Sequence, residues 1–233
     1  MLRPRHRLGW LLLCVLGLTA CRTEQRRTHS PAASVPPAAF TVSEDFENTP
    51  VGAQADGAES HVENKGDSLA VTEETAASGR RSLKFQDAPG FQSAFNPRLV
   101  YAPHHTAGTT QCAFDLRVES GAVMYHEWRD DANPYRVGPI FWIRDGKLSV
   151  AGNELMAVPA GQWVHIEIIA KLGAQATGTW DLAVRLPGRE TKAFRDLKTG
   201  SPDWRKLDWL GFVSNADART AFYLDNLLLT NER

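Results

Sequence analysis

Apolar and polar residues alternate with a period of two in many short segments of this chain, and this alternation constrains the fold more than any other feature. In residues 162–173, Val164, Ile166 and Ile168 alternate with more polar neighbours, which is the pattern of a strand with one face in a core. Residues 179–188 repeat the pattern. No segment shows an extended helical period, so the sequence predicts an all-β domain.

Turn residues separate the expected strands. Asp145-Gly146 lies between two β-rich runs, and this dipeptide supplies the positive φ angles that a tight hairpin turn needs. Many short strands separated by Gly, Pro, Asn and Asp predict an antiparallel β-sandwich, and no internal repeat indicates a propeller or a solenoid. Further strands are expected at residues 80–87, 111–120, 207–214 and 221–230.

Residues 1–20 are typical of a signal peptide. Three arginines within the first seven residues form a basic start, and an apolar run of eleven residues follows from Leu8 to Leu18. That run is shorter than the roughly 20 residues of a membrane-spanning helix, which favours a secretory signal over a short membrane anchor. We therefore exclude residues 1–20 from the folded domain.

Leu18-Thr19-Ala20-Cys21 resembles the lipobox of bacterial lipoproteins. The resemblance implies cleavage before Cys21 and lipidation of this residue with a diacylglycerol and a further acyl chain such as palmitate. Two or more chains anchor a protein stably, so we expect a lipoprotein held in the bacterial cell envelope by its lipid. Arg22 follows the cysteine where an Asp would indicate inner-membrane retention, which favours the outer membrane or the cell surface.

We expect residues 21–39 to comprise the lipidated cysteine and a flexible linker. The linker is expected because this segment contains three Pro and no periodic apolar pattern. The β-sandwich domain is expected over residues 40–233. Of the three Cys, only Cys112 then belongs to the domain, so no disulfide can form within it. We expect Cys112 to be a small buried side chain rather than a nucleophile, since no activating base lies near it in the sequence.

The expected domain is mildly acidic. From Phe40 to Arg233 it has 20 Lys and Arg against 26 Asp and Glu, a formal charge of −6. Because nucleic-acid binding depends on basic side chains that neutralise phosphates, no nucleic-acid partner is expected. The length of this region fits one sandwich domain.

Four short segments resemble the landmarks of jelly-roll domains of the laminin-G-like, concanavalin-type and carbohydrate-binding-module kind. The resemblance covers nearly all of the domain. It implies that the first and last strands pair beside each other and that a glycan lies on the concave sheet. The four segments are EDFENTPVGA at residues 44–53, ASGRRSLKF at 77–85, VPAGQWVHIEI at 158–168 and AFYLDNLLL at 221–229.

Several jelly-roll binding modules hold a structural Ca²⁺ between an acidic residue near the N-terminus and an aspartate of the last strand. This sequence resembles them at Glu47 and Asp225, and calcium takes six to eight oxygen ligands. The resemblance therefore implies a structural Ca²⁺ at these two residues. The alternative is that both carboxylates cap turns or face solvent, because no loop with fixed calcium-binding spacing is present.

The segment YHEWRDD and the residues after it concentrate aromatic and ionisable groups. Period-two geometry predicts that Tyr125, Glu127 and Arg129 share one face of a strand. Aromatic rings stack on sugar rings, and charged groups bind hydroxyls and carboxylates. Alternatively, Trp128 and Trp142 fill the core and the charged groups form a surface ion pair. The expected ligand-binding residues are Tyr125, Glu127, Trp128, Arg129, Tyr135 and Arg136.

Signatures of catalysis are weak. The strand motif Glu-x-Asp-x-x-Glu, which glycosidases of this fold usually carry, is absent, and so are a nucleophile elbow, a phosphate loop and a zinc-spaced His pair. A jelly-roll polysaccharide lyase would need an acid, a base and a cation that neutralises the uronate. Residues of these types are Tyr125, His126, Arg129 and His165.

We expect an envelope-anchored, lectin-like module that binds glycan or another envelope component without catalysis. Two alternatives stay open. One is an extracellular polysaccharide lyase or glycoside hydrolase of jelly-roll fold, and the other is a structural module that docks to a partner protein. The expected partners are a polysaccharide or other glycan and, through the lipid anchor, the membrane.

Overall fold

The computed structural model describes residues 40–232, so the expected signal peptide, Cys21 and the linker lie outside the described residues. Within residues 40–232 the chain forms strands and one 3-10 turn, Gly173–Gln175, and no helix there is long and apolar enough to span a bilayer. The strands are β1 (Val42–Glu44), β2 (Glu59–His61), β3 (Ser68–Thr72), β4 (Ser82–Gln86), β5 (Arg98–Tyr101), β6 (Gly108–Val118), β7 (Met124–Arg129), β8 (Val137–Arg144), β9 (Lys147–Val150), β10 (Asn153–Ala157), β11 (Trp163–Leu172), β12 (Thr179–Arg185), β13 (Lys192–Lys198), β14 (Trp209–Ser214) and β15 (Ala221–Glu232).

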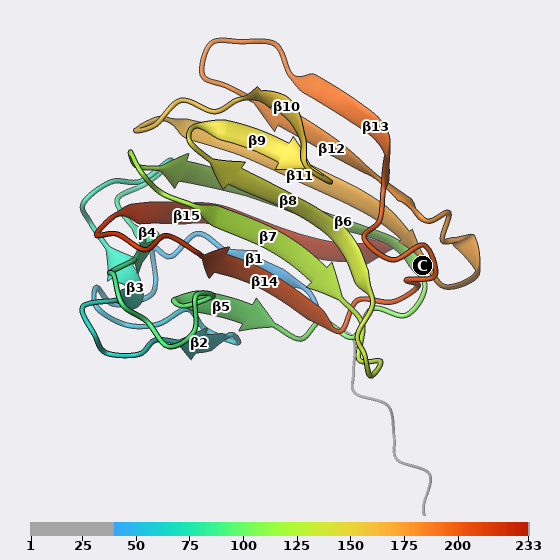
Figure 1. Ribbon diagram of the computed structural model, residues 1–233, viewed down its shortest axis with the longest axis horizontal. Helices are drawn as coiled ribbons and strands as arrows, with labels where there is room; N and C mark the ends of the chain where they lie inside the picture. The colour runs from blue at the N-terminus through green and yellow to red at the C-terminus, as the bar shows by residue number, and fades with distance from the viewer. Residues whose placement is uncertain (1–39, 233) are drawn as a thin grey trace, which may run out of the picture. The chain divides into compact units, whose positions relative to one another are not determined.

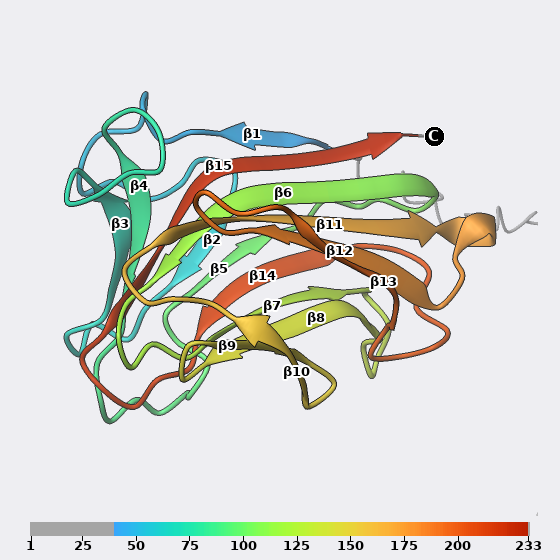
Figure 2. The same cartoon turned by 90° about the horizontal axis from the view of Figure 1, so that it is seen from above.

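The strands form two antiparallel sheets that lie as two layers (Figures 1 and 2). Sheet A has the order β13-β12-β11-β6-β15-β4-β3, and β1 also pairs with β15. Sheet B has the order β10-β9-β8-β7-β14-β5-β2 and faces the viewer in Figure 1. The domain is therefore an antiparallel β-sandwich of the jelly-roll type, as the sequence predicts.

The first and last strands of the described chain pair with each other. Val42 of β1 lies opposite Leu229 of β15 in an antiparallel ladder. The predicted hairpin is also present, because Asp145 and Gly146 have φ angles of 52° and 68° and connect β8 to β9. The hairpin was predicted from its turn dipeptide, and the pairing of the first and last strands was implied by the jelly-roll resemblance.

The core lies between the two sheets and is filled by the inward-facing residue of each alternation. Phe114 of β6 meets Phe212 of β14 edge to face, with ring centroids 5.0 Å apart, and so joins sheet A to sheet B. Burying one large apolar side chain of this kind contributes about 1.5–3 kcal/mol. Cys112 is fully buried in the same layer, and burial raises the pKa of its thiol. It is the small buried residue that the sequence predicts.

Candidate functional site

Strand β7 carries the segment that the sequence singles out, and its residues alternate between the two faces of sheet B. Met124, His126 and Trp128 are fully buried in the core. Tyr125 and Glu127 lie on the outer face and keep 8% and 6% of their surface exposed. The alternation predicted from period-two geometry is therefore present, because a strand turns successive side chains to opposite faces.

The expectation that Trp128 contacts a ligand is wrong for this arrangement. Its side chain has no exposed surface, and its indole Nε1 donates a hydrogen bond to Nε2 of His126 at 2.7 Å. Burial lowers the pKa of His126 to about 3, so this imidazole is neutral. Both residues belong to the core because they occupy the even-numbered positions of β7, and neither reaches the outer face.

The register of sheet B decides which residues lie beside the outward face of β7. Tyr125 is opposite Val213 of β14, which in turn is opposite Arg98 of β5. Two rows further along the same face, Arg129 is opposite Trp209 of β14, and the row between them pairs Glu127 with Gly211. Residues from three strands that are distant in sequence thus meet on one face of the sheet.

These residues surround a groove of about 370 Å³, which we call the sheet B groove. Tyr125, Arg129 and Tyr135 were predicted from the sequence. The other lining residues come from β14, β5 and the segment before β5, and local patterns did not single them out. The complete lining is Phe95, Arg98, Tyr125, Arg129, Tyr135 and Trp209.

Arg129 is held in place by two aromatic rings and one carboxylate. Its guanidinium carbon lies 4.0 Å from the ring centroid of Trp209 and 4.2 Å from that of Tyr135. Its Nε forms an ion pair with Glu127. Cation–π contacts of this kind are worth about 0.5–2 kcal/mol each. The guanidinium is therefore fixed before any ligand arrives, and Glu127 orients it rather than facing open solvent.

Gly211 allows Trp209 to lie flat against the sheet. A Cβ atom added at Gly211 would stand 2.0 Å from the indole ring of Trp209, far inside contact distance. Gly211 also lies opposite Glu127 in the ladder between β14 and β7. The missing side chain therefore makes room for the ring that stacks on Arg129.

Arg98 is the second cation of the sheet B groove. Its guanidinium carbon lies 5.1 Å from the ring of Phe95, and Nη1 donates to Oδ1 of Asn96 at 2.6 Å. Among the described residues it forms no ion pair with a carboxylate. Burial lowers its pKa, but an arginine stays protonated at neutral pH. Arg98 therefore brings a charge to the groove that no protein carboxylate within ion-pair distance neutralises.

Tyr125 supplies the one hydroxyl among the buried lining residues. Burial raises its pKa and so does the nearby Glu127, whereas Arg129 and Arg98 act in the opposite direction. The ring packs against that of Trp142 of β8 at an interplanar angle of 30°, with centroids 4.4 Å apart. Tyr125 is therefore a neutral phenol at neutral pH that can donate or accept a hydrogen bond.

Tyr135 and Arg136 follow β7 in the turn that leads to β8. Tyr135 is 50% exposed and covers Arg129. Arg136 forms ion pairs with two carboxylates instead, with Nε 3.0 Å from Oδ2 of Asp130 and Nη1 3.4 Å from Oδ2 of Asp203. Arg136 therefore does not line the sheet B groove.

Glu47 and Asp225 both hold the loop before β4. Oε1 of Glu47 accepts the backbone N–H groups of Arg80 and Arg81, each at 2.7 Å. Oδ2 of Asp225 accepts those of Ala77 at 2.8 Å and Ser78 at 3.2 Å. N–H donors at these oxygens oppose a cation, and no group of three or more His, Cys, Asp or Glu in residues 40–232 could hold a metal. The residues as arranged do not fit Ca²⁺, and the expected ion stays a prediction.

The four residues whose types a lyase would need do not meet at one place. Tyr125 and Arg129 line the sheet B groove. His126 is in the core, and His165 lies on β11 in sheet A. The groove is thus lined by two arginines and two phenols but by no histidine.

The fold is that of the jelly-roll sandwiches, and the solved structures that share it include two named as lyases of glucuronan and alginate. Neither a protein-family model nor a curated protein sequence matches the chain. The class therefore comes from structure alone, and sequence similarity adds nothing to it.

Three solved structures illustrate the likeness. The cellulose induced protein Cip1 has a TM-score of 0.55 at 15% identity, over 82% of this chain and 98% of that one. The endo-β-1,4-glucuronan lyase of the fungus Trichoderma reesei has 0.53 at 12%, over 78% and 94%. Alginate lyase Aly36B has 0.53 at 11%, over 84% and 99%. At such low identity these values show a common fold.

Proposed function

We propose that the domain is a non-catalytic glycan-binding module whose ligand lies in the sheet B groove and carries negative charge. The observation that carries the proposal is the pair of arginines. Arg129 is fixed between two aromatic rings, and Arg98 has no carboxylate partner in the described part of the chain. Such a pair suits carboxylates and hydroxyls of an acidic sugar, because arginine forms charge-assisted hydrogen bonds.

The aromatic rings support the same ligand class. Tyr135 and Trp209 flank Arg129, and Phe95 lies against Arg98. A ring that is partly exposed at the side of a groove offers a flat apolar surface to a pyranose. Two of the structural neighbours are named as lyases of glucuronan and alginate, and the sugar units of both polymers carry carboxylates.

A lyase of uronate polymers is the second candidate. Tyr125 favours it, because its phenol lies in the groove and the charges of Arg98 and Arg129 lower its pKa in part. Burial outweighs that effect, so the phenol is a poor base at neutral pH. No imidazole lines the sheet B groove. Binding without turnover therefore fits the lining better than elimination does.

Calorimetric titration of the full chain with acidic and neutral oligosaccharides tests the proposal. We expect the acidic sugars to bind, and Arg98→Gln to weaken them about tenfold, the scale of one charge-assisted hydrogen bond. If no glycan binds, the proposal is wrong and the protein-docking alternative takes its place. Release of unsaturated uronate that disappears in Tyr125→Phe would establish the lyase instead.

We also propose that the domain acts at the bacterial cell envelope, tethered by lipid on Cys21. Support comes from the lipobox-like Leu18 to Cys21 and from the basic and apolar segments before it. The linker of residues 21–39 would let the groove meet a glycan at a distance from the membrane. An outer-membrane or cell-surface position suits a binder of polymers too large to cross the envelope.

A further inference from the structure

The outer face of sheet A carries a row of ionisable residues that the sheet B groove does not use. Antiparallel pairing places Arg185 of β12 opposite His165 of β11 and His165 opposite Asp115 of β6. Asp115 is in turn opposite Asp225 of β15. Four adjacent strands thus present Arg, His, Asp and Asp in one line across the sheet.

Hydrogen bonds fix the middle of this row. Nδ1 of His165 lies 2.9 Å from Oδ1 of Asp115, and Nδ2 of Asn226 donates to Oδ2 of Asp115 at 2.6 Å. Burial raises the pKa of Asp115, but these two contacts lower it more, so it is a carboxylate at neutral pH. A carboxylate at Nδ1 favours the tautomer with its proton there. Nε2 of His165 is then left to face a ligand.

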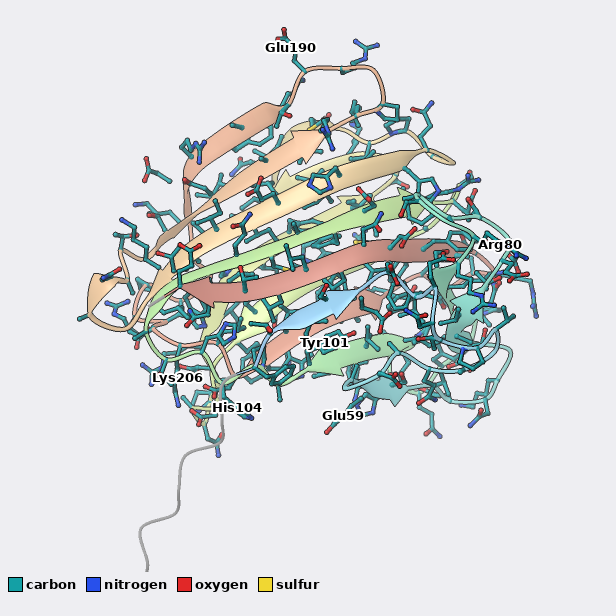
Figure 3. The ribbon with its side chains drawn as sticks, turned by 180° about the vertical axis from the view of Figure 1, so that it is seen from behind. Glu59, Arg80, Tyr101, His104, Glu190 and Lys206 are labelled. Atoms are coloured by element: carbon teal, nitrogen blue, oxygen red, sulfur yellow. The ribbon has the colours of Figure 1, made fainter. Side chains whose placement is uncertain are left out.

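A pocket of about 340 Å³ opens beside this row, between the turn after β12 and the loop before β4. Figure 3 shows the molecule from the side opposite to Figure 1, with sheet A toward the viewer, and there Glu190 marks that turn and Arg80 that loop. Trp163 forms part of the wall, and its Nε1 donates to Oγ1 of Thr75 at 3.2 Å. The pocket therefore has a fixed aromatic side and a fixed imidazole.

Two arginines give the pocket its charge. Arg185 and Arg189 both line it, both are exposed, and neither forms an ion pair with any residue of the described domain. Other exposed arginines on sheet A do have partners, such as Arg195 with Asp181 at 2.7 Å. Asp115 contributes the one carboxylate among the residues that line the pocket, whereas Arg185 and Arg189 contribute two cations. The balance is positive even though the domain is acidic.

We propose that this pocket is a second binding site, for an anionic sugar unit that carries a carboxylate or a sulfate. The guanidinium groups of Arg185 and Arg189 hold the anion. His165 Nε2 bonds a hydroxyl, and the indole of Trp163 lies against the sugar ring. The site goes beyond the sheet B groove and is independent of it, since the two lie on opposite outer faces of the sandwich.

Calorimetric titration of the full chain with a short oligogalacturonate and with a sulfated oligosaccharide of equal length tests the proposal. We compare the wild type, the double variant Arg185→Gln with Arg189→Gln, Arg98→Gln, and Arg195→Gln as a control for charge on the same sheet. In the double variant the number of oligosaccharides bound per chain should fall by one, or the affinity of one of the sites should fall at least about tenfold. Arg195→Gln should leave both the number and the affinity unchanged, and the stronger probe identifies the anion.

The two proposals fail separately. Loss of one equivalent in the double variant supports the sheet A pocket whether or not Arg98→Gln changes binding, and only Arg98→Gln reports on the sheet B groove. The proposal of a sheet A binding site is wrong if the double variant binds both probes as the wild type does. It is also wrong if Arg195→Gln lowers the affinity for the probes as much as the double variant does. Because Arg185 and Arg189 are exposed and unpaired, their replacement should leave the unfolding midpoint unchanged.

Discussion

Two neighbours on β7, Arg129 and Trp128, face opposite sides of the same sheet. Arg129→Ala removes a guanidinium from the sheet B groove and should cost about 1–3 kcal/mol of glycan binding. It should also lower stability, because it removes two cation–π contacts and leaves Glu127 without its ion-pair partner. Trp128→Ala empties a fully buried volume and should lower the free energy of unfolding by about 3–5 kcal/mol. Calorimetric titration and urea unfolding measure the two effects.

Arg136→Ala is the matched control for Arg129→Ala, because Arg136 lies in the adjoining turn and pairs with Asp130 and Asp203 outside the groove. It should leave glycan affinity within about twofold. Equal losses from both arginine variants would mean that net charge, rather than the groove, determines binding.

Gly211 and Gly138 both lie against a tryptophan, but on different faces of sheet B. A Cβ at Gly211 would displace Trp209, which stacks on Arg129, whereas a Cβ at Gly138 would come within 2.5 Å of the fully buried Trp204. We expect Gly211→Ala to weaken glycan binding with a small loss of stability. Gly138→Ala should lower the unfolding midpoint instead. Titration with thermal unfolding checks both, and the opposite pattern would contradict the assigned faces.

At the scale of one element, the loop before β4 depends on a buried carboxylate. Burial raises the pKa of Asp225 to about 6, although hydrogen bonds from Ser78, Ala77 and Asn226 lower it in part, and Asp115 raises it further. The folded state therefore binds this proton more tightly than the unfolded state does. The resulting stabilisation is complete below about pH 4 and is lost as the pH rises through about 6.

Asp225→Asn removes this titration and keeps an oxygen for the loop. Relative to the variant, the wild type should lose stability between about pH 4 and 7. Urea unfolding at a series of pH values measures the difference, and a difference that does not change with pH contradicts the prediction. The same experiment with millimolar Ca²⁺ tests the expected ion, since an ion bound only to the folded state raises the unfolding midpoint.

The faces of β7 could be predicted from the sequence because alternation is a local property of one strand. Tyr125 and Arg129 point outward for that reason alone. The residues beside them could not be predicted, since Arg98 and Trp209 reach the sheet B groove only through the order of strands in sheet B. We also predicted Trp128 as a ligand-binding residue because its neighbours are aromatic and charged. The alternation of β7 instead places Trp128 on the same inward face as Met124 and His126.

The two sheets differ in how much the sequence revealed. The hairpin at Asp145-Gly146 and the pairing of β1 with β15 followed from turn chemistry and from the resemblance. The row through His165 and Asp115 did not, because its members are common polar residues on four separate strands. Only the register between β11 and β6 brings these two side chains together.

At the scale of the whole molecule, the expected anchor can be tested without reference to the fold. Cys21→Ser should abolish lipidation, because an acyl thioether needs the sulfur, and should move the protein from the membrane to the soluble fraction. Fractionation with metabolic labelling by a fatty acid measures both effects. Equal membrane retention in the Ser variant would contradict the lipoprotein prediction, and Cys112→Ser serves as the control that keeps the anchor.

Cys112 lies in β6 between Ile168 of β11 and Leu229 of β15, in the middle of sheet A and with no exposed surface. If the lipoprotein prediction is correct, the mature protein loses Cys14 with the signal peptide and carries lipid on Cys21, which leaves Cys112 as its single thiol. Fraying of edge strands does not uncover a position in the middle of a sheet. A thiol reagent can therefore reach Cys112 only when the whole sandwich unfolds. The rate of modification of this thiol then reports the rate of global unfolding.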